Sequence, residues 1–297
     1  VKYRFYGAIE AARAGAVASL IRSVSPYSFR QPHTGMMIYS DTVPKIPHAA
    51  IPQEDAAMLD RMHGRGQDPV IKLYMEADTL PDALSYNLMG EIRGSELPDE
   101  IIAIGGHSDS WDAGTGAHDD GAGCIATWEA VKLLKELDLI PRRTVRAVWW
   151  VNEENGVRGG KQYAEDHGDE PHVLMFEFDS GVFPPQTIGY SGPDYMYDLV
   201  KSAEPLLKMI NDSLYVRDRA WGVDIRYMVE KGIPSMNINT DDDGKYFYYH
   251  HSPKDTPDHV DPRDLNDCVA AIALAIYIYA DLPVDLRKTT GAKNETR

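Results

Sequence analysis

Residues 101–123 read IIAIGGHSDSWDAGTGAHDDGAG, and this segment decides the fold. It opens on a short continuous apolar run, which is typical of a strand buried on both faces in a parallel sheet. The middle of the segment is mostly polar or small, so it cannot be part of a core. From about Gly121 to Leu137, apolar residues recur at spacings of three and four, as on the buried face of a helix. The segment therefore predicts a strand, an acidic loop and a helix in succession.

Strands and helices continue to alternate along the chain from about residue 87. Short apolar runs predict strands, and amphipathic runs predict helices. The expected strands are 87–94, 101–106, 145–151, 173–178 and 234–239, and the expected helices are 121–137, 159–167, 193–210 and 264–280. Pro205 should kink or split the helix at 193–210. We expect an α/β fold with a mixed, mostly parallel sheet and helices on both faces.

The first 86 residues have a different composition. Five prolines fall between residues 26 and 52, which predicts loops and short edge strands. Residues 7–14 favour a helix, and residues 17–21 and 69–77 are patterned like strands.

The overall composition excludes several classes of protein. The chain has 297 residues, 46 of them acidic and 30 basic, which gives a formal net charge of −16. Such a charge argues against nucleic acid or an anionic membrane as the main partner. Apolar runs stay shorter than the ~18 residues that a membrane span needs. Cys124 and Cys268 lie in apolar, helix-like contexts, and we expect buried free thiols there.

Polar residues follow directly after three of the expected strands. His107 and Asp109 come after the strand at 101–106. Glu153 and Glu154 come after the next strand, and Asp179 comes after the strand at 173–178. The carboxyl ends of parallel strands meet at one edge of an open α/β sheet, where such sheets place their functional sites. We therefore expect these side chains to converge.

Two further clusters belong with them. Asp119 and Asp120 directly precede the helix at 121, and His250 and His251 lie in the late loop YYHHSPKDT. Carboxylates packed together without a counter-charge would repel one another, and several would have to bind protons. A divalent cation removes this problem, and a mixture of histidine and carboxylate ligands suits zinc best. Four or five ligands exceed the three of an ordinary catalytic zinc, so we expect two metals about 3.5–4 Å apart that share one aspartate.

Five motifs carry a resemblance to a known family. In order, they are GGHSDSWD, GAHDDGAG, VNEENG, FEFDSG and HHSPKDT, and they resemble those of the M28 family of zinc aminopeptidases and carboxypeptidases. The resemblance extends over nearly the whole chain, including the stretch PHTGMM at 32–37. It implies two Zn²⁺ ions per chain, with Asp119 bridging them. By the same resemblance the zinc ligands are His107, Asp119, Glu154, Asp179 and His251.

The resemblance also implies three catalytic roles. Glu153 would be the general base that takes a proton from the metal-bridging water. Asp109 would orient the imidazole of His107. His250 matches the position where relatives place a residue that stabilises the tetrahedral intermediate.

The domain organisation and the biology are implied in the same way. Residues 87–297 would form the zinc peptidase domain, and residues 1–86 would form part of a β-rich, protease-associated insert domain that is incomplete at its N-terminus. The substrates would be dipeptides or short peptides with a free N-terminus. The protein would be a homodimer that is secreted or lysosomal, with no nucleic acid or membrane partner.

Some residues keep two interpretations. Asp120 is either the N-cap of the helix at 121–137 or part of the metal site. Asp224 is favoured as the cap of a short helix at 224–230, and the alternative is an anchor for the ammonium group of a substrate. His118 is expected at the solvent or at the rim of a pocket.

Two other functions stay open on the same scaffold. One is a metal-free binding or receptor protein, and the other is a single-zinc acyltransferase resembling the glutaminyl cyclases. The presence of all five ligand residues argues against both. The number of metal ions bound per chain would separate the three functions.

Overall fold

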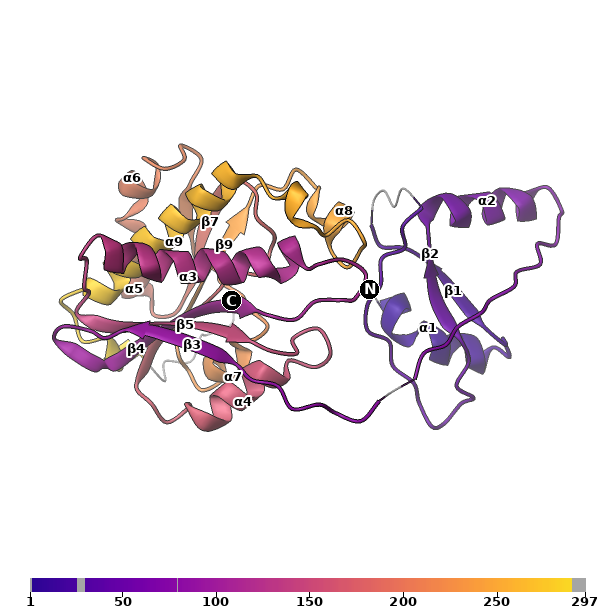
Figure 1. Cartoon of the computed structure of the whole chain (residues 1–297), viewed down its shortest axis with the longest axis horizontal. Coiled ribbons are helices and arrows are strands. Elements are labelled where there is room, and N and C mark those ends of the chain that lie inside the picture. The colour runs from indigo at the N-terminus through magenta and orange to yellow at the C-terminus, as the bar shows by residue number, and fades with distance from the viewer. Residues whose placement is uncertain (1, 26–29, 79, 290–297) are drawn as a thin grey trace. The chain divides into compact units, whose positions relative to one another are not determined.

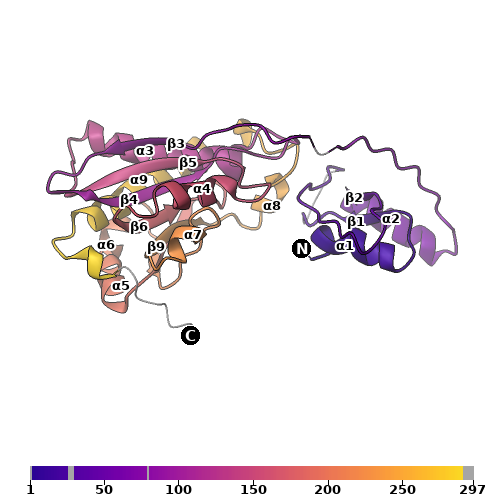
Figure 2. The same ribbon diagram turned by 90° about the horizontal axis from the view of Figure 1, so that it is seen from below.

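The computed structural model describes residues 2–25, 30–78 and 80–289. It divides into two compact units, which are described separately (Figures 1 and 2). The first unit consists of Val1–Leu84, Trp111–Thr115 and Phe247–Asp255, and the second of Ser85–Ser110, Gly116–Tyr246 and Thr256–Arg297. Among the helices of the described residues, none combines the length and the apolar character that crossing a bilayer requires.

The first unit contains two helices and a small parallel sheet. Its elements are α1 (Lys2–Arg13), β1 (Ser19–Arg22), β2 (His48–Ile51) and α2 (Gln53–Gly64), and β1 pairs with β2. The expected helix near residue 7 and the expected strand near residue 17 are confirmed. Residues 26–29 of the expected proline-rich region lie outside the described residues.

The strand expected at 69–77 is wrong. These residues lie in no strand, and their side chains are largely exposed, with Val70 at 96% and Tyr74 at 74%. Alternation of apolar and polar residues stabilises a strand only where a neighbouring strand pairs with it and one face is buried. Residues 69–77 have neither in the described structure.

The second unit is built on a seven-stranded sheet within the described residues. The strand order is β3-β5-β4-β6-β9-β7-β8. The strands are β3 (Leu88–Ile92), β4 (Leu97–His107), β5 (Arg143–Trp150), β6 (His172–Glu177), β7 (Pro185–Ser191), β8 (Tyr215–Arg217) and β9 (Ser235–Thr240). The neighbours β5, β4, β6 and β9 run parallel, whereas β3 and β7 lie antiparallel to β5 and β9. The expected mixed, mostly parallel sheet is confirmed, although the sequence analysis missed β7 and β8.

Helices cover both faces of this sheet, as expected (Figure 1). On one face lie α3 (Ala122–Glu136), α5 (Asp194–Lys201), α6 (Glu204–Leu207) and α9 (Pro262–Asp281), and on the other lie α4 (Arg158–Asp166) and α7 (Arg226–Val229). Successive residues of a strand point to opposite faces, so Ile102 and Ile104 join the core under α3 and α9, while Ala103 joins the core under α4. The expected break near Pro205 is confirmed, because α5 ends before this proline and Pro205 lies in the first turn of α6.

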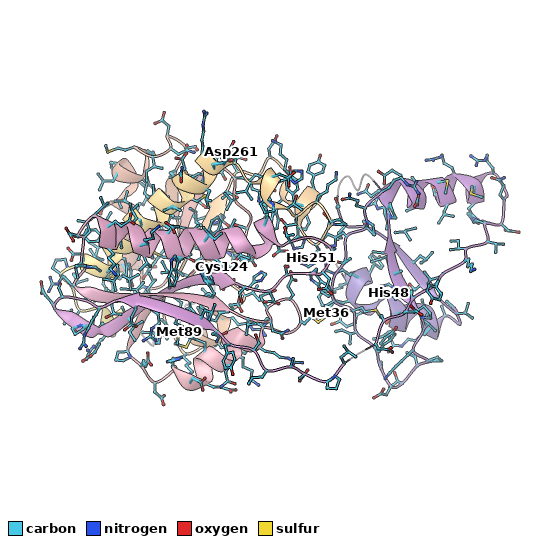
Figure 3. All side chains as sticks on the ribbon, viewed as in Figure 1. Met36, His48, Met89, Cys124, His251 and Asp261 are labelled. Atoms are coloured by element: carbon cyan, nitrogen blue, oxygen red, sulfur yellow. The ribbon has the colours of Figure 1, made fainter. Side chains whose placement is uncertain are left out.

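Short helices and two cysteines complete the unit. The short helices are η1 (Ala117–Gly121), α8 (Tyr246–Tyr249), η2 (Pro257–His259) and η3 (Leu286–Thr289). Cys124 and Cys268 are buried free thiols, as expected. Cys124 is labelled in Figure 3. Its thiol donates to the carbonyl oxygen of His107 at 3.1 Å, which joins the start of α3 to the end of β4.

A buried ion pair joins β4, β5 and the segment after α9. The Nε of Arg143 lies 2.6 Å from Oε2 of Glu100, and both side chains are at most 5% exposed. The same guanidinium donates to the carbonyl oxygens of Leu282 at 2.7 Å and Val284 at 2.6 Å. A buried charge is tolerated only with such partners, so Arg143 fixes the C-terminal segment to the sheet.

We expect Arg143→Leu to lower the free energy of unfolding by about 3–5 kcal/mol, because it leaves a buried carboxylate without its buried partner. The control is Arg142→Leu, which breaks an ion pair with Glu96, a residue that is 58% exposed. Loss of that surface pair should cost less than about 1 kcal/mol. Urea denaturation followed by circular dichroism measures both values. Equal losses in the two variants would contradict a structural role for the buried pair.

Candidate metal centre

Three neighbouring parallel strands bring the predicted site residues to one edge of the sheet. His107 is the last residue of β4, the glutamates 153 and 154 follow β5, and Asp179 follows β6. Since β4 pairs in parallel with both β5 and β6, these carboxyl ends are adjacent. The expected position of the site at the carboxyl edge of the sheet follows directly from this register.

His107 lies at the centre of the cluster. Its Nε2 is 3.2 Å from Oδ1 of Asp119 and 3.8 Å from Oδ1 of Asp179. The ligand atoms of His107, Asp119 and Glu154 lie within 4.8 Å of one another, and so do those of His107, Asp120 and Asp179. The structure therefore brings together four of the five predicted zinc ligands.

Asp109 positions its neighbours through two different groups. Its backbone carbonyl oxygen lies 2.9 Å from Nδ1 of His107. A carbonyl can only accept, so Nδ1 carries the proton and Nε2 faces the carboxylates. The Asp109 carboxylate accepts the backbone N–H groups of Glu153 at 2.9 Å and Glu154 at 3.3 Å. One residue thus fixes both the imidazole and the loop that carries the two glutamates.

Asp120 is not a helix cap. The N-cap of α3 is Gly121, and no side chain caps this helix end. Instead, Oδ2 of Asp120 accepts the backbone N–H of His107 at 3.0 Å. Side chains at Gly106 and Gly123 would collide with the Asp120 carboxylate, so these glycines make room for it. The metal-site interpretation of Asp120 is the one that fits this geometry, and the peptide bond between Asp119 and Asp120 is cis.

The electrostatics of the cluster call for a cation. Burial raises the pKa of Glu153 to about 8 and raises the pKa of Asp120 well above its usual range. Burial disfavours the charged form of His107, but its hydrogen bond to Asp119 and the nearby carboxylate of Asp179 outweigh this effect and raise the pKa of His107. In the absence of a metal, the cluster therefore retains protons to reduce its negative charge.

A divalent metal ion fits the residues present. One oxygen of Asp120 and one of Asp179, the Oδ1 atom in each, are buried and accept no hydrogen bond from the described residues. Buried carboxylate oxygens normally find a donor or a cation. Imidazole nitrogen and carboxylate oxygen are also the ligands that zinc takes in catalytic sites.

Asp224 forms part of a buried carboxyl pair that the sequence analysis missed. The N-cap of α7 is Ile225, so the favoured interpretation of Asp224 as a cap is wrong. The backbone N–H groups of Val223 and Ile225 instead donate to the Glu177 carboxylate, at 2.7 and 3.0 Å. The Asp224 carboxyl is 1% exposed and accepts no hydrogen bond from the described residues. Burial and the neighbouring Glu177 raise its pKa well above the usual range.

Glu177 was missed because its place in the sequence looks ordinary. Burial and the nearby Asp179 raise its pKa to about 7. Its signals in the sequence are a glutamate inside the apolar run VLMFEF at 173–178 and its place in the motif FEFDSG.

His118 does not face the solvent or a pocket rim, contrary to expectation. The side chain is fully buried and stacks on Phe183, with 4.8 Å between the ring centroids. Its Nδ1 accepts the backbone N–H of Val182 at 3.2 Å, and its Nε2 lies 3.2 Å from the carbonyl oxygen of His259. His118 therefore ties η1 to η2 and to the loop that contains Val182.

His250 and His251 belong to the first unit, where they contact His33 and Thr34. Nδ1 of His250 lies 2.8 Å from Nε2 of His33, and Nδ1 of His251 lies 3.2 Å from the carbonyl oxygen of Thr34. Sequence reasoning missed His33 as a site residue, although it stands in the stretch PHTGMM. The assignment of His251 as a zinc ligand and of His250 as a catalytic group stays a prediction.

Comparisons with known proteins identify relatives over most of the chain. A family model described as peptidase family M28 matches residues 87–276. Carboxypeptidase Q of Mus musculus is 44% identical over 284 residues, which are 95% of this chain and 60% of the relative. Carboxypeptidase Q of Xenopus laevis is 46% identical over 285 residues, with the same shares. The chain thus spans about three-fifths of the length of these relatives.

Solved structures give the same picture of the fold. The crystal structure of a peptidase M28 precursor from Shewanella amazonensis is 36% identical, with a TM-score of 0.91 over 97% of this chain and 65% of that chain. BSAP, a zinc aminopeptidase from Bacillus subtilis, is 18% identical, with a TM-score of 0.65 over 95% of this chain and 69% of that chain. At that identity the second likeness concerns the fold alone.

The raised pKa of Asp224 makes the stability of the metal-free protein depend on pH. Asp224 binds its proton more tightly in the folded than in the unfolded chain. Its contribution to the free energy of unfolding therefore falls as pH rises from about 4 toward neutrality. Asp224→Asn keeps the shape but cannot ionise. We therefore expect the variant to gain stability relative to the native chain as pH rises, measured by urea denaturation with a chelator present.

The control for this experiment is Asp212→Asn, at an exposed position in the same unit. Because this substitution removes an exposed carboxylate, the variant's free energy of unfolding should stay within about 0.5 kcal/mol of the native value. A pH-independent difference between Asp224→Asn and the native chain would show that Asp224 ionises in the folded protein as it does in the unfolded one.

Proposed function

The chain belongs to peptidase family M28, as its five motifs predict, and on this premise we propose that it acts as a zinc-dependent exopeptidase on dipeptides or short peptides. The observation that carries the proposal is the cluster around His107. Its Nε2 lies within 3.2 Å of Asp119 and 3.8 Å of Asp179, at the carboxyl edge of the sheet. The names of the carboxypeptidase Q relatives support a peptidase that acts at a chain end.

We propose that two zinc ions bind this cluster and that they share one aspartate. The two overlapping groups of ligand atoms around His107 support this number. Asp119 would be the bridge, His107 and Asp179 would complete one site, and Glu154 would serve the other, with His251 of the motif HHSPKDT as its remaining ligand. When bound, such ions polarise a carbonyl group and lower the pKa of a bound water to about 7.

Glu153 is proposed as the general base. Efficient proton transfer requires a group whose pKa lies near the working pH. Burial brings the pKa of Glu153 to about 8, so it can accept a proton from the attacking water and release it to the leaving amine. The two hydrogen bonds from the backbone of 153 and 154 to Asp109 hold this loop in place, which allows adjacent glutamates to take different tasks.

The remaining assignments rest on the resemblance and on burial. His250 is proposed to stabilise the tetrahedral intermediate. Asp224 is proposed to anchor the ammonium group of a substrate, because a buried neutral carboxyl ionises most readily when a cation approaches it. We also propose a protease-associated-like domain at 1–86, a homodimer, and a secreted or lysosomal location for the full-length protein.

Metal content is the first test of the proposal. We expect about two zinc ions per chain after dialysis, measured by plasma mass spectrometry of the purified protein. A single ion would favour the cyclase-like acyltransferase. No bound ion would favour a binding protein.

Glu153→Gln separates catalysis from metal binding. The variant should keep two zinc ions, because residue 153 is not a proposed ligand, and should lose about 10²–10⁴-fold in kcat. Glu165→Gln, at an exposed position of α4, is the matched control and should retain native values. Undiminished turnover in Glu153→Gln would sink the general-base assignment.

Asp119→Ala tests the bridge. Because Asp119 would bind both ions, its loss should abolish binding of both, with a loss of activity that added zinc does not restore. Isothermal titration of the metal-free variant with zinc measures this directly. Retention of one tight site would contradict the shared aspartate.

A further inference from the structure

Two distant segments of the first unit form a histidine cluster. His33 and Thr34 lie beside His250 and His251, the latter labelled in Figure 3. The ring of His33 is stacked 5.0 Å from that of His250 and 4.9 Å from that of His251. The backbone N–H of Thr34 donates to the carbonyl oxygen of His251 at 3.0 Å, so the two segments are held together by main chain as well as by rings.

The partner of His251 determines which of its nitrogens carries the proton. Its Nδ1 lies 3.2 Å from the carbonyl oxygen of Thr34. A carbonyl oxygen only accepts, so Nδ1 of His251 must donate. In the neutral ring this leaves the lone pair on Nε2. A metal-binding histidine presents such an Nε2 lone pair when a carbonyl orients its other nitrogen.

The proton on His33 is fixed from its other side. Nη1 of Arg4 lies 3.5 Å from Nδ1 of His33 and also donates to the Thr34 carbonyl oxygen at 3.4 Å. A guanidinium only donates, so Nδ1 of His33 accepts and the proton of this ring resides on Nε2. A side chain at Gly35 would lie 2.5 Å from Nη1 of Arg4, so the glycine gives the guanidinium room to approach.

His33 then imposes the opposite arrangement on His250. Its Nε2–H points to Nδ1 of His250 at 2.8 Å, so Nδ1 of His250 accepts and the proton of His250 lies on Nε2. We propose that His33 and Thr34 are positioning residues that hold His250 and His251 in opposite tautomers. His250 offers an N–H donor from Nε2, and His251 offers a lone pair from the same atom.

This arrangement gives identical neighbours different chemistry. An N–H donor suits stabilisation of the negative charge that develops on a substrate oxygen, and a lone pair suits a zinc ion. The use of the His250 donor for that purpose rests on the function proposed above. The tautomers themselves are argued from the contacts of Arg4, His33 and Thr34 and do not rest on that function.

Nitrogen-15 NMR of the full chain, labelled at its histidine rings, tests the tautomers directly. The His250 signals are identified by their absence in His250→Gln. In the metal-free native chain, Nδ1 of His250 should show the shift of an unprotonated nitrogen and Nε2 that of a protonated one. His33→Leu removes the donor and should produce shifts averaged between two tautomers. His33→Gln, whose amide can donate from the place of Nε2, should restore the native pattern.

The control is His63→Gln, an exposed position of α2, which should leave the His250 signals unchanged. A proton on Nδ1 of His250 in the native chain would overturn the proposal. So would a single native-like tautomer in His33→Leu. Should the leucine variant fail to fold, the native spectrum and the glutamine variant still decide the question.

Activity of the zinc-loaded chain gives a second readout. His33→Leu should lower kcat for a dipeptide by about tenfold or more with little change in KM, since an oxyanion donor acts in the transition state. His33→Gln should recover most of this loss. If the native chain hydrolyses no dipeptide, the proposed function fails, while the NMR result still decides the tautomers. A loss that appears only in KM would contradict the role in the transition state.

Discussion

The repulsion among buried carboxylates at the carboxyl edge of the sheet is the constraint on which the rest of the site depends. Asp119, Asp120 and Glu154 are each at most 8% exposed and share one small volume around His107. Such a group is unstable unless protons or cations offset its charge. The surrounding structure supports it with main-chain donors, since Asp120 accepts from the end of β4 and Asp109 accepts from the loop after β5. The sheet thus supplies rigidity, and a bound metal would supply the missing positive charge.

Much of the fold could be predicted because buried parallel strands leave a strong pattern in the sequence. The apolar runs at 101–106, 145–151 and 173–178 became β4, β5 and β6. The strands β7 and β8 were missed for local reasons. β7 begins with Pro185, which favours a loop in sequence reasoning, and β8 is only three residues long. The strand predicted at 69–77 is absent from the described structure, because alternation of apolar and polar residues does not show whether a partner strand exists.

The site could be predicted by residue type, but the partners of individual side chains could not. His107 and the acidic residues after each strand were found from order and spacing alone. Asp224 was assigned to a helix end, and the same interpretation stayed open for Asp120, because capping is a local rule, whereas packing decided both cases. Asp120 turns to the end of β4 through space left by two glycines, and Asp224 is buried beside Glu177. His33 was missed because its partner is 217 positions away.

The division of the chain into units has a consequence for how such proteins diverge. Residues 247–255 belong to the first unit, although the sequence on either side of them belongs to the second. The histidine pair of these residues is therefore tied to positions 33 and 34, which stand 217 positions earlier in the sequence. The two stretches are therefore expected to be inherited together. A chimaera that took residues 1–84 from a distant relative without His33 would remove the donor that places the proton of His250 on Nε2. Recombination between family members should succeed only where both stretches come from the same parent.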